Sequence, residues 1–303
     1  MAVRGIICVG RVTGGVQVAT TCSRPCDDDA EGDTMSSEPT SDRQVRHVHT
    51  WRGVTVAASA AAALLSALVM AQPAGRTFPL TAATGLRLHN VDVAPATLDG
   101  KQGLRMTIAA AARRQIEAMT PQEREQAAAV GRFDEQLAVI EGVQFGNGTI
   151  EAEIAGAPAA DAPAGARGFV GIAFRVQPDM LTYDAFYLRP TNGRADDQVR
   201  RNHSAQYVSH PDWPWFRLRK EMPEKYESYV DLVPGAWTRI RIEVRDTQAR
   251  LYVHDQPQPT LIVNDLKTGA AATGAIALWI DAGTEAHFRN LTVTPAGPLA
   301  PQR

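Results

Sequence analysis

The side chains best suited to binding chemistry gather in one stretch of the chain, residues 168–227. Its arginine, asparagine, glutamine and histidine side chains supply directed hydrogen-bond donors, which hydroxyl and carboxylate groups accept. Its two tryptophans offer indole faces on which the apolar face of a ligand ring can stack. These residue types predict one ligand site, formed by Arg175, Tyr187, Arg189, Asn192, Arg201, His203, Gln206 and Trp213 or Trp215. The alternative is that one or both tryptophans only anchor this stretch to the rest of the protein.

Two acids have a spacing that suits a general acid and its partner. Glu151 and Glu153 lie two apart in an alternating segment, which puts both side chains on one face of a strand. Two carboxylates about 5–10 Å apart across a sugar can cleave a glycosidic bond. No third acid follows at residues 154–157, and solvated charges beside a hairpin are the commoner case. The pair is therefore only a weak catalytic candidate.

The sequence contains no recognisable metal or cofactor motif. His203 and His210 have no partner at ligand spacing, so no metal site is expected there. Calcium binding by Asp196 and Asp197 stays an alternative, although these two acids do not follow a calcium-loop pattern. No nucleophile-elbow, phosphate-loop or dinucleotide-binding motif is present, and no cofactor is expected.

Two alternating strands carry the first part of the candidate site. Phe174 in the first strand and Phe186 and Leu188 in the second are assigned to the apolar core face. The side chains of opposite parity then share the other face. That polar face is predicted to hold Arg175, Tyr183, Tyr187 and Arg189.

The stretch after the second strand, residues 190–227, is predicted to be a long ordered connection. It contains large rings, too many for a disordered segment, and many hydrogen-bonding side chains. Since it begins where the second strand ends, it can fold back over the polar face of the two strands. The sequence therefore predicts that the sheet and this connection surround one ligand.

Further short alternating segments, separated by turns, predict an all-β fold, a β-sandwich or jelly roll. An Asn-Gly hairpin turn at residues 147–148 precedes one of these segments. One helical insert is expected at residues 109–130, with a capping box from Thr120 to Glu123. The other expected strands are centred on residues 86–88, 104–108, 150–154, 240–244, 251–253, 276–280 and 288–293.

The order of the strand segments resembles the concanavalin A-like lectin/glucanase superfamily, which includes laminin-G-like domains and 3-keto-disaccharide hydrolase domains. The resemblance covers roughly residues 80–295. It implies an antiparallel two-sheet jelly-roll β-sandwich, with a ligand, usually carbohydrate, on the concave sheet or its rim loops. The chain departs from the catalytic family-16 motif, Glu-x-Asp-x-(x)-Glu. The matching segments are FGNGTIEAEI (145–154), GFVGIAFR (168–175), WTRIRIEV (237–244), ARLYV (249–253) and GAIALW (274–279).

Residues 48–71 have the order of a secretory signal peptide. His49 and Arg52 precede an apolar run, and Val69-Met70-Ala71 supplies small residues before a cleavage point. The expected product is secreted or periplasmic, and the alternative is an uncleaved membrane anchor. The mature domain is then expected to span residues 72–303, with its core at 80–295.

Residues 1–47 are polar and without periodicity, which predicts an unstructured leader or a start codon assigned too early, with Met35 as an alternative start. All three cysteines of the chain lie in this leader, and their spacing does not favour a zinc site. The net charge of −2 argues against a nucleic-acid partner. A membrane partner is expected only if the leader is not cleaved.

Three functions remain open from the sequence. The favoured one is an exported domain that binds carbohydrate or a glycoconjugate, or recognises a cell surface, without catalysis. The second is a glycoside hydrolase of the same fold. The third is a structural or protein-interaction sandwich whose polar stretch only stabilises itself.

Overall fold

The computed structural model describes residues 75–129, 135–162 and 165–296. All of these residues belong to one compact unit, Ser66–Arg303. The expected leader, signal peptide and cysteines lie outside the described residues. None of the helices in the described ranges is long and apolar enough to cross a membrane.

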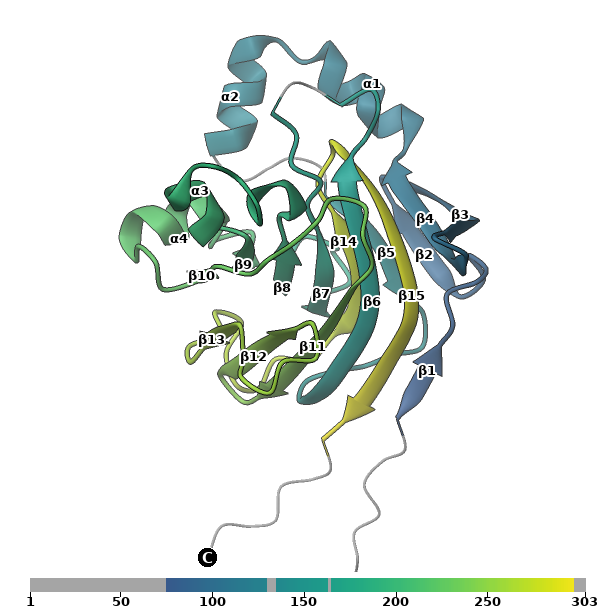
Figure 1. Cartoon of the computed structure of the whole chain (residues 1–303), viewed down its shortest axis with the longest axis vertical. Helices are drawn as coiled ribbons and strands as arrows, with labels where there is room; N and C mark the ends of the chain where they lie inside the picture. Colours follow the sequence, from purple (N-terminus) through teal and green to yellow (C-terminus); the bar gives the residue numbers. More distant parts are fainter. Residues whose placement is uncertain (1–74, 130–134, 163–164, 297–303) are drawn as a thin grey trace, which may run out of the picture. The chain divides into compact units, whose positions relative to one another are not determined.

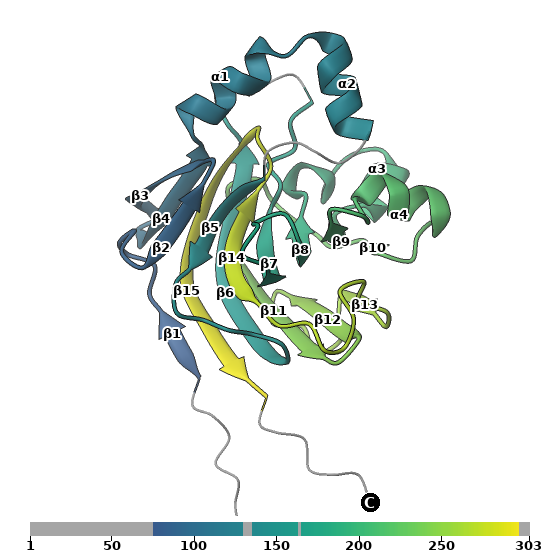
Figure 2. The same cartoon turned by 180° about the vertical axis from the view of Figure 1, so that it is seen from behind.

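Two antiparallel sheets make up the fold, which confirms the predicted jelly-roll sandwich (Figures 1 and 2). Sheet A has the strand order β13-β12-β11-β6-β15-β4-β3, and β1 also pairs with β15. Its strands are β1 (Arg76–Phe78), β3 (Val91–Leu98), β4 (Lys101–Ile108), β6 (Gly148–Pro158), β11 (Thr238–Arg245), β12 (Gln248–Val253), β13 (Leu261–Val263) and β15 (Thr284–Pro295).

Sheet B has the strand order β10-β9-β8-β7-β14-β5-β2. Strands β7, β8 and β9 are neighbours in the sequence, whereas β14 comes from the C-terminal part of the chain and pairs between β7 and β5. The strands of sheet B are β2 (Leu86–His89), β5 (Gln136–Ile140), β7 (Val170–Val176), β8 (Tyr183–Leu188), β9 (Ala205–His210), β10 (Glu227–Ser228) and β14 (Ala275–Ile280).

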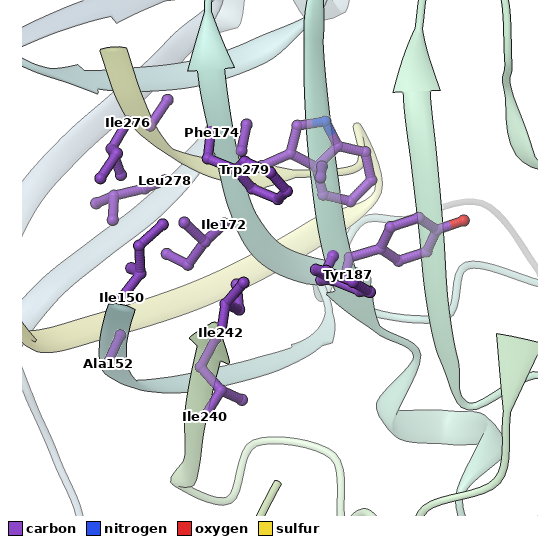
Figure 3. Packing of buried hydrophobic residues seen from close by; sticks show 14 of the residues in the cluster. Ile150, Ala152, Ile172, Phe174, Tyr187, Ile240, Ile242, Ile276, Leu278 and Trp279 are labelled. Atoms are coloured by element: carbon purple, nitrogen blue, oxygen red, sulfur yellow. The ribbon is translucent and has the colours of Figure 1, made fainter. Parts of the chain in front are cut away.

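The core fills the space between the two sheets. Alternate residues of β6 and β11 in sheet A face alternate residues of β7 and β14 in sheet B, as the period-two pattern predicts (Figure 3). Phe174 stacks on Phe186 with 6.2 Å between the ring centroids. Labelled members of this core in Figure 3 are Ile150, Ala152, Ile172, Phe174, Ile240, Ile242, Ile276 and Leu278.

The predicted helical insert is confirmed as α1 (Ala110–Ala118) and α2 (Pro121–Ala129), which lie at one end of the sandwich (Figure 1). The capping box also forms. Thr120 N donates to Glu123 Oε2 at 2.7 Å, and Glu123 N donates to Thr120 Oγ1 at 3.2 Å. These reciprocal bonds satisfy backbone donors that the first turn of a helix leaves free.

The stretch predicted to be a long connection contains regular structure instead. Strands β9 and β10 extend sheet B beyond β8. Two short helices, α3 (Gln198–Asn202) and α4 (Trp215–Glu221), and the 3₁₀ turn η1 (Pro190–Asn192) lie beside these strands. The prediction of a connection was wrong because polar side chains occupy several positions of β9, so its alternation is not one of apolar and polar residues.

Candidate functional site

The face of sheet B that points away from sheet A, which we call the outer face, carries a row of polar and aromatic side chains. The row crosses five neighbouring strands, because the Cα pairing links Glu227 to Gln206, Gln206 to Tyr187, Tyr187 to Gly171 and Gly171 to Trp279. Residues from distant parts of the sequence therefore lie side by side on one face. Tyr187 and Trp279 lie to one side of the apolar cluster in Figure 3.

A row of small side chains runs beside this first row. Val208, Ala185, Ala173 and Ala277 pair in register across β9, β8, β7 and β14. Beyond them on the same face lies Tyr183, which pairs with His210. Small side chains leave room above the sheet for the larger rings on either side of them.

Gly171 allows the rings of Tyr187 and Trp279 to meet across β7. Their ring centroids lie 4.8 Å apart. A Cβ atom on Gly171 would lie 2.2 Å from the carbonyl oxygen of Phe186 and 2.6 Å from Cβ of Tyr187. Both distances are far below van der Waals contact, so no other residue fits here without moving the strand.

An acid–base cluster forms at one end of the outer face. The Tyr183 hydroxyl donates to the Glu135 carboxylate, and Trp279 Nε1 donates to the Tyr183 hydroxyl oxygen at 3.0 Å. His210 Nδ1 lies 3.0 Å from Glu135 Oε1, without a well-directed hydrogen bond, and the His210 ring stacks on Tyr183. Burial raises the pKa of Tyr183 well above its usual value, and the Glu135 charge raises it further. Tyr183 therefore stays protonated and acts as a donor.

Arg189 forms the opposite end of the face. Its Nη2 donates to the Tyr187 hydroxyl at 2.8 Å and to Gln206 Oε1 at 3.0 Å. Its guanidinium lies over the rings of Phe169, Tyr187 and Trp215, at 4.9, 5.3 and 5.6 Å from the centroids. Aromatic faces stabilise a cation at these distances. Trp215, at the start of α4, is 41% exposed and leaves part of its ring open to solvent.

His203 and Arg219 complete this end around the carboxylate of Glu227. His203 Nδ1 lies 2.6 Å from Glu227 Oε2, and Arg219 Nε donates to both carboxylate oxygens at 3.1 Å. Burial lowers the pKa of His203, and the charges of Arg219 and Arg189 lower it further, whereas Glu227 raises it. Because the net shift is downward, the neutral imidazole is favoured at pH 7.

The structure brings together Tyr187, Arg189, His203, Gln206 and Trp215 from the predicted site. Gln206 is fully buried, and its amide donates to the backbone oxygens of Tyr207 and Tyr226, so it orients Arg189. Asn192, in η1, is 1% exposed and therefore offers no open surface to a ligand. Its Oδ1 accepts from Arg167 and Arg200, and its Nδ2 donates to the carbonyl of His203.

The prediction that Arg175 lies on the outer face was wrong. Its side chain is 0% exposed, and its donors are used inside the protein. A register shift between β7 and β14 and a positive φ of 57° at Arg175 interrupt the alternation, so the side chain turns away from Tyr187. Its partners are the backbone oxygens of Gly146, Asp246 and Gly269, Asn147 Oδ1, Thr268 Oγ1 and, at 3.8 Å, the carboxylate of Asp184.

Trp213 and Arg201 make contacts that suit anchoring residues. The Trp213 ring packs against the core, with the Arg217 guanidinium at 4.0 Å and Lys267 Nζ at 4.7 Å from its centroid. Arg201 lies over the ring of Tyr229 and donates to its hydroxyl at 2.9 Å. For Trp213 the alternative considered from the sequence, an anchor, fits the structure better.

Glu151 and Glu153 lie on β6 of sheet A, whereas the other candidates lie on or beside sheet B. Glu153 contacts Lys101 and Arg289 at 3.4 Å and accepts from Asn290 at 2.8 Å. Burial raises the pKa of Glu153, but the hydrogen bond from Asn290 and the charge of Arg289 outweigh it, and the pKa falls below its usual value. A general acid needs the opposite shift. These contacts favour the interpretation as surface ion pairs.

The sequence did not reveal several residues of the outer face. Tyr183 was placed on the correct face by alternation, but Glu135 precedes a strand from another part of the chain and carries no local signal. Trp279 lies in an alternating segment whose pairing partner cannot be read from the sequence. Within the described residues no group of three or more His, Cys, Asp or Glu side chains could hold a metal ion. Asp197 caps α3, with its Oδ1 accepting from Arg200 N at 2.8 Å.

Comparisons with solved structures give distant similarities. They include a carbohydrate-binding module, CBM66, from Bacillus subtilis (11% identity, 68% of this chain, 95% of that chain, TM-score 0.39). A beta-glucanase from Bacillus licheniformis has 13% identity over 73% of this chain and 97% of its own, with a TM-score of 0.36. Domain 4 of AbnA, an extracellular arabinanase from Geobacillus stearothermophilus in complex with arabinotriose, has 12% identity, coverage of 73% and 82%, and a TM-score of 0.36. No curated protein matches the chain.

The sequence model of one family matches residues 129–294, which is more than half of the chain. The match covers β5 to β15 and thus most of the outer face. It confirms the resemblance to 3-keto-disaccharide hydrolase domains and makes this a sugar-related jelly roll. The chain therefore belongs to the family of 3-keto-alpha-glucoside-1,2-lyase-like domains.

Proposed function

We propose that the outer face of sheet B binds a glycoside. The observation that carries this proposal is the indole ring of Trp215, which is 41% exposed at the rim of a face with hydrogen-bonding clusters at Arg189 and His210. The neighbouring rings of Tyr187 and Trp279 form the floor of this face and are 2% and 8% exposed. An aromatic ring can cover the apolar face of a sugar, while guanidinium, imidazole and carboxylate groups bond its hydroxyls. Membership in a sugar-related family supports the same ligand class.

The outer surface of sheet A is less suited to this function. Its polar side chains are engaged with each other, as in the pairs of Arg105 with Glu285 and Arg239 with Asp255. Trp237 there uses its indole N–H on the carbonyl of Leu98 at 3.0 Å. Side chains that already satisfy one another offer little binding energy to a ligand.

Calorimetric titration of the full chain with a panel of glycosides tests the proposal. Trp215→Ala removes a partly exposed ring at the rim and is expected to weaken binding about tenfold, or about 1.4 kcal/mol. Trp237→Ala removes a tryptophan that directly precedes β11 of sheet A, and it serves as the matched control. Equal weakening by both variants, or none by Trp215→Ala while the wild type binds, would contradict the proposed location.

A second candidate function is catalysis at the His210 end of the same face. The position of His210 Nδ1, 3.0 Å from Glu135 Oε1, favours it, because a carboxylate beside Nδ1 favours a proton on that nitrogen and leaves Nε2 available as a base. The family description suggests a 1,2-elimination on a 3-keto glucoside. In that reaction a base takes the C2 proton, which the neighbouring C3 ketone makes acidic. The C1–C2 double bond forms as the C1–O bond breaks, and the leaving oxygen gains a proton.

Incubation of the protein with a 3-keto glucoside, followed by the ultraviolet absorbance of the unsaturated ketone, distinguishes catalysis from binding alone. If His210 is the base, His210→Gln should lower turnover about 10²–10⁴-fold while the affinity for the glycoside changes little. Turnover that is unaffected by His210→Gln would exclude this role. Binding of the substrate by the wild type without any turnover would leave the first function alone.

A further inference from the structure

Four arginines gather at the end of the outer face that is opposite His210. Arg189 follows β8, Arg219 lies on α4, Arg200 on α3 and Arg167 just before β7. Burial lowers the pKa of Arg167, and the positive charges of Arg200, Arg189 and Arg219 lower it further. The contacts place these groups in two close pairs, because Arg167 and Arg200 share the Asn192 oxygen and Arg189 and Arg219 share the Glu227 carboxylate.

The carboxylates at this end do not balance these charges. Glu227 is shared by Arg219, His203 and, at 3.9 Å, Arg189. Asp281 also interacts with Arg189: burial raises the pKa of Asp281 while Arg189 lowers it, and the net shift is upward. Four guanidinium groups therefore meet the carboxylates of Glu227 and Asp281 at this end. Among the described residues this leaves an excess of positive charge.

Within the described part of the chain, the guanidinium groups of two of the four arginines donate only to neutral partners. Arg167 Nη1 donates to Asn192 Oδ1 at 3.2 Å, and Arg200 Nε donates to the same oxygen at 3.0 Å. Arg200 Nη2 adds the carbonyl and hydroxyl oxygens of Thr191. One amide oxygen thus holds two guanidinium groups in place without neutralising either of them.

Arg189 also has a donor without a partner. Its side chain is 5% exposed, yet its Nε makes no hydrogen bond. A buried unsatisfied donor is costly, and such a group is commonly completed by a ligand or by solvent. The guanidinium fork suits a planar carboxylate, which can accept two parallel hydrogen bonds from it.

We propose that this end of the face, around Arg167 and Arg189, is a subsite for a carboxylate on the bound sugar, so that the preferred ligand is an acidic glycoside of the uronide type. This inference rests on the proposed sugar-binding function. It adds the chemical class of the ligand and the orientation in which the ligand lies on the outer face. The acidic group lies at the Arg189 end, and the rest of the sugar extends over Tyr187 and Trp279 toward His210.

The test uses matched pairs of neutral and acidic ligands on the full chain: methyl glucoside with methyl glucuronoside, and methyl galactoside with methyl galacturonoside. At least one acidic member is expected to bind about tenfold or more tightly than its neutral partner at low salt. This advantage should shrink when the ionic strength is raised to about 1 M, where the screening length is about 3 Å.

Variants then locate the subsite. Arg167→Gln keeps a donor for Asn192 but removes the charge, and it should cost about tenfold in affinity for the acidic ligand while the neutral ligand changes less than about twofold. Lys220→Gln is the matched control, because Lys220 is an exposed cation next to Arg219 on α4. It loses the same charge and should leave both affinities unchanged.

The outcomes separate this inference from the function on which it rests. Binding of neutral glycosides without preference for their acidic partners would overturn the carboxylate subsite and leave the sugar-binding face standing. If Arg167→Gln lowers only the melting temperature and the protein still prefers the acidic ligands, Arg167 serves only to hold Asn192 in place. That result would also overturn the carboxylate subsite. Failure of every ligand to bind would overturn both proposals.

Discussion

Replacement of Arg175 by methionine should destabilise the domain strongly and leave ligand binding intact in the folded protein. Methionine keeps much of the length of the side chain but removes its charge and all of its donors. The buried carboxylate of Asp184 then loses the nearby cation, 3.8 Å away. Three backbone oxygens, those of Gly146, Asp246 and Gly269, lose a hydrogen-bond donor.

The magnitude follows from burial, since both Arg175 and Asp184 are 0% exposed. Removal of one partner of a buried ion pair typically costs about 3–5 kcal/mol, because the other charge is left uncompensated. Burial already raises the pKa of Asp184, and the charge of Arg175 opposes that rise. Loss of Arg175 should raise the pKa of Asp184 further. For a domain of this size the cost corresponds to a fall in Tm of roughly 6–20 °C.

Urea denaturation followed by circular dichroism measures the free energy of unfolding. Arg239→Met is the matched control, because Arg239 is an exposed arginine with two surface partners, and its loss should cost less than about 1 kcal/mol. The double variant Arg175→Met with Asp184→Asn should recover part of the loss, since it removes the orphaned charge. A cost below about 1 kcal/mol for Arg175→Met, or a specific loss of glycoside binding, would refute the assignment of Arg175 to the interior.

Two further perturbations test other parts of the structure. Gly171→Ala should destabilise the domain by about 1–3 kcal/mol and shift the tryptophan fluorescence, because its Cβ would clash with Phe186 and separate Tyr187 from Trp279. An unchanged spectrum and urea midpoint would contradict this. Burial raises the pKa of Asp265, but hydrogen bonds, led by that from Lys225, outweigh burial and lower the pKa to about 2. The ionised Asp265 therefore stabilises the fold above about pH 4, the ordinary pKa of an aspartate. This stabilisation is lost as the pH falls through about 2. The Tm difference between wild type and Asp265→Asn should shrink over that range, and a constant difference would contradict the assignment.

Alternation predicted the fold because most strands have one face in the core and one in solvent. In β6, Ile150 and Ile154 are buried while Glu151 and Glu153 make surface ion pairs, and the same pattern recurs in β11. The inward face of each such strand can be predicted from its own sequence, without information on the strands that pair with it. The two-sheet sandwich could therefore be predicted from the sequence.

Sheet B behaves differently, because β7, β8 and β5 are buried on both faces. In a strand that is buried on both sides, the two faces do not differ clearly in polarity, so alternation does not identify the inward face. In β9 the polar residues Gln206 and Ser209 are buried on opposite faces, so the strand was interpreted as part of a connection. Arg175 was misplaced because a bulge, which local alternation cannot show, reverses the direction of its side chain.

The part of the site that the sequence could not supply depends on strand order. Trp279 reaches Tyr187 only because β14 pairs with β7, more than ninety residues away in the chain, and because the residue between them is glycine. Glu135 directly precedes β5, and β5 pairs with the edge of β14 that faces away from β7. This pairing brings the Glu135 carboxylate to the Tyr183 hydroxyl. The cluster at His210 thus depends on the position of β14 between β7 and β5 in sheet B. A change that displaced β14 would therefore separate Trp279 from both Tyr187 and the Tyr183 hydroxyl. Arg189, Gln206 and Glu227 would keep their contacts, because they lie on or directly after β8, β9 and β10.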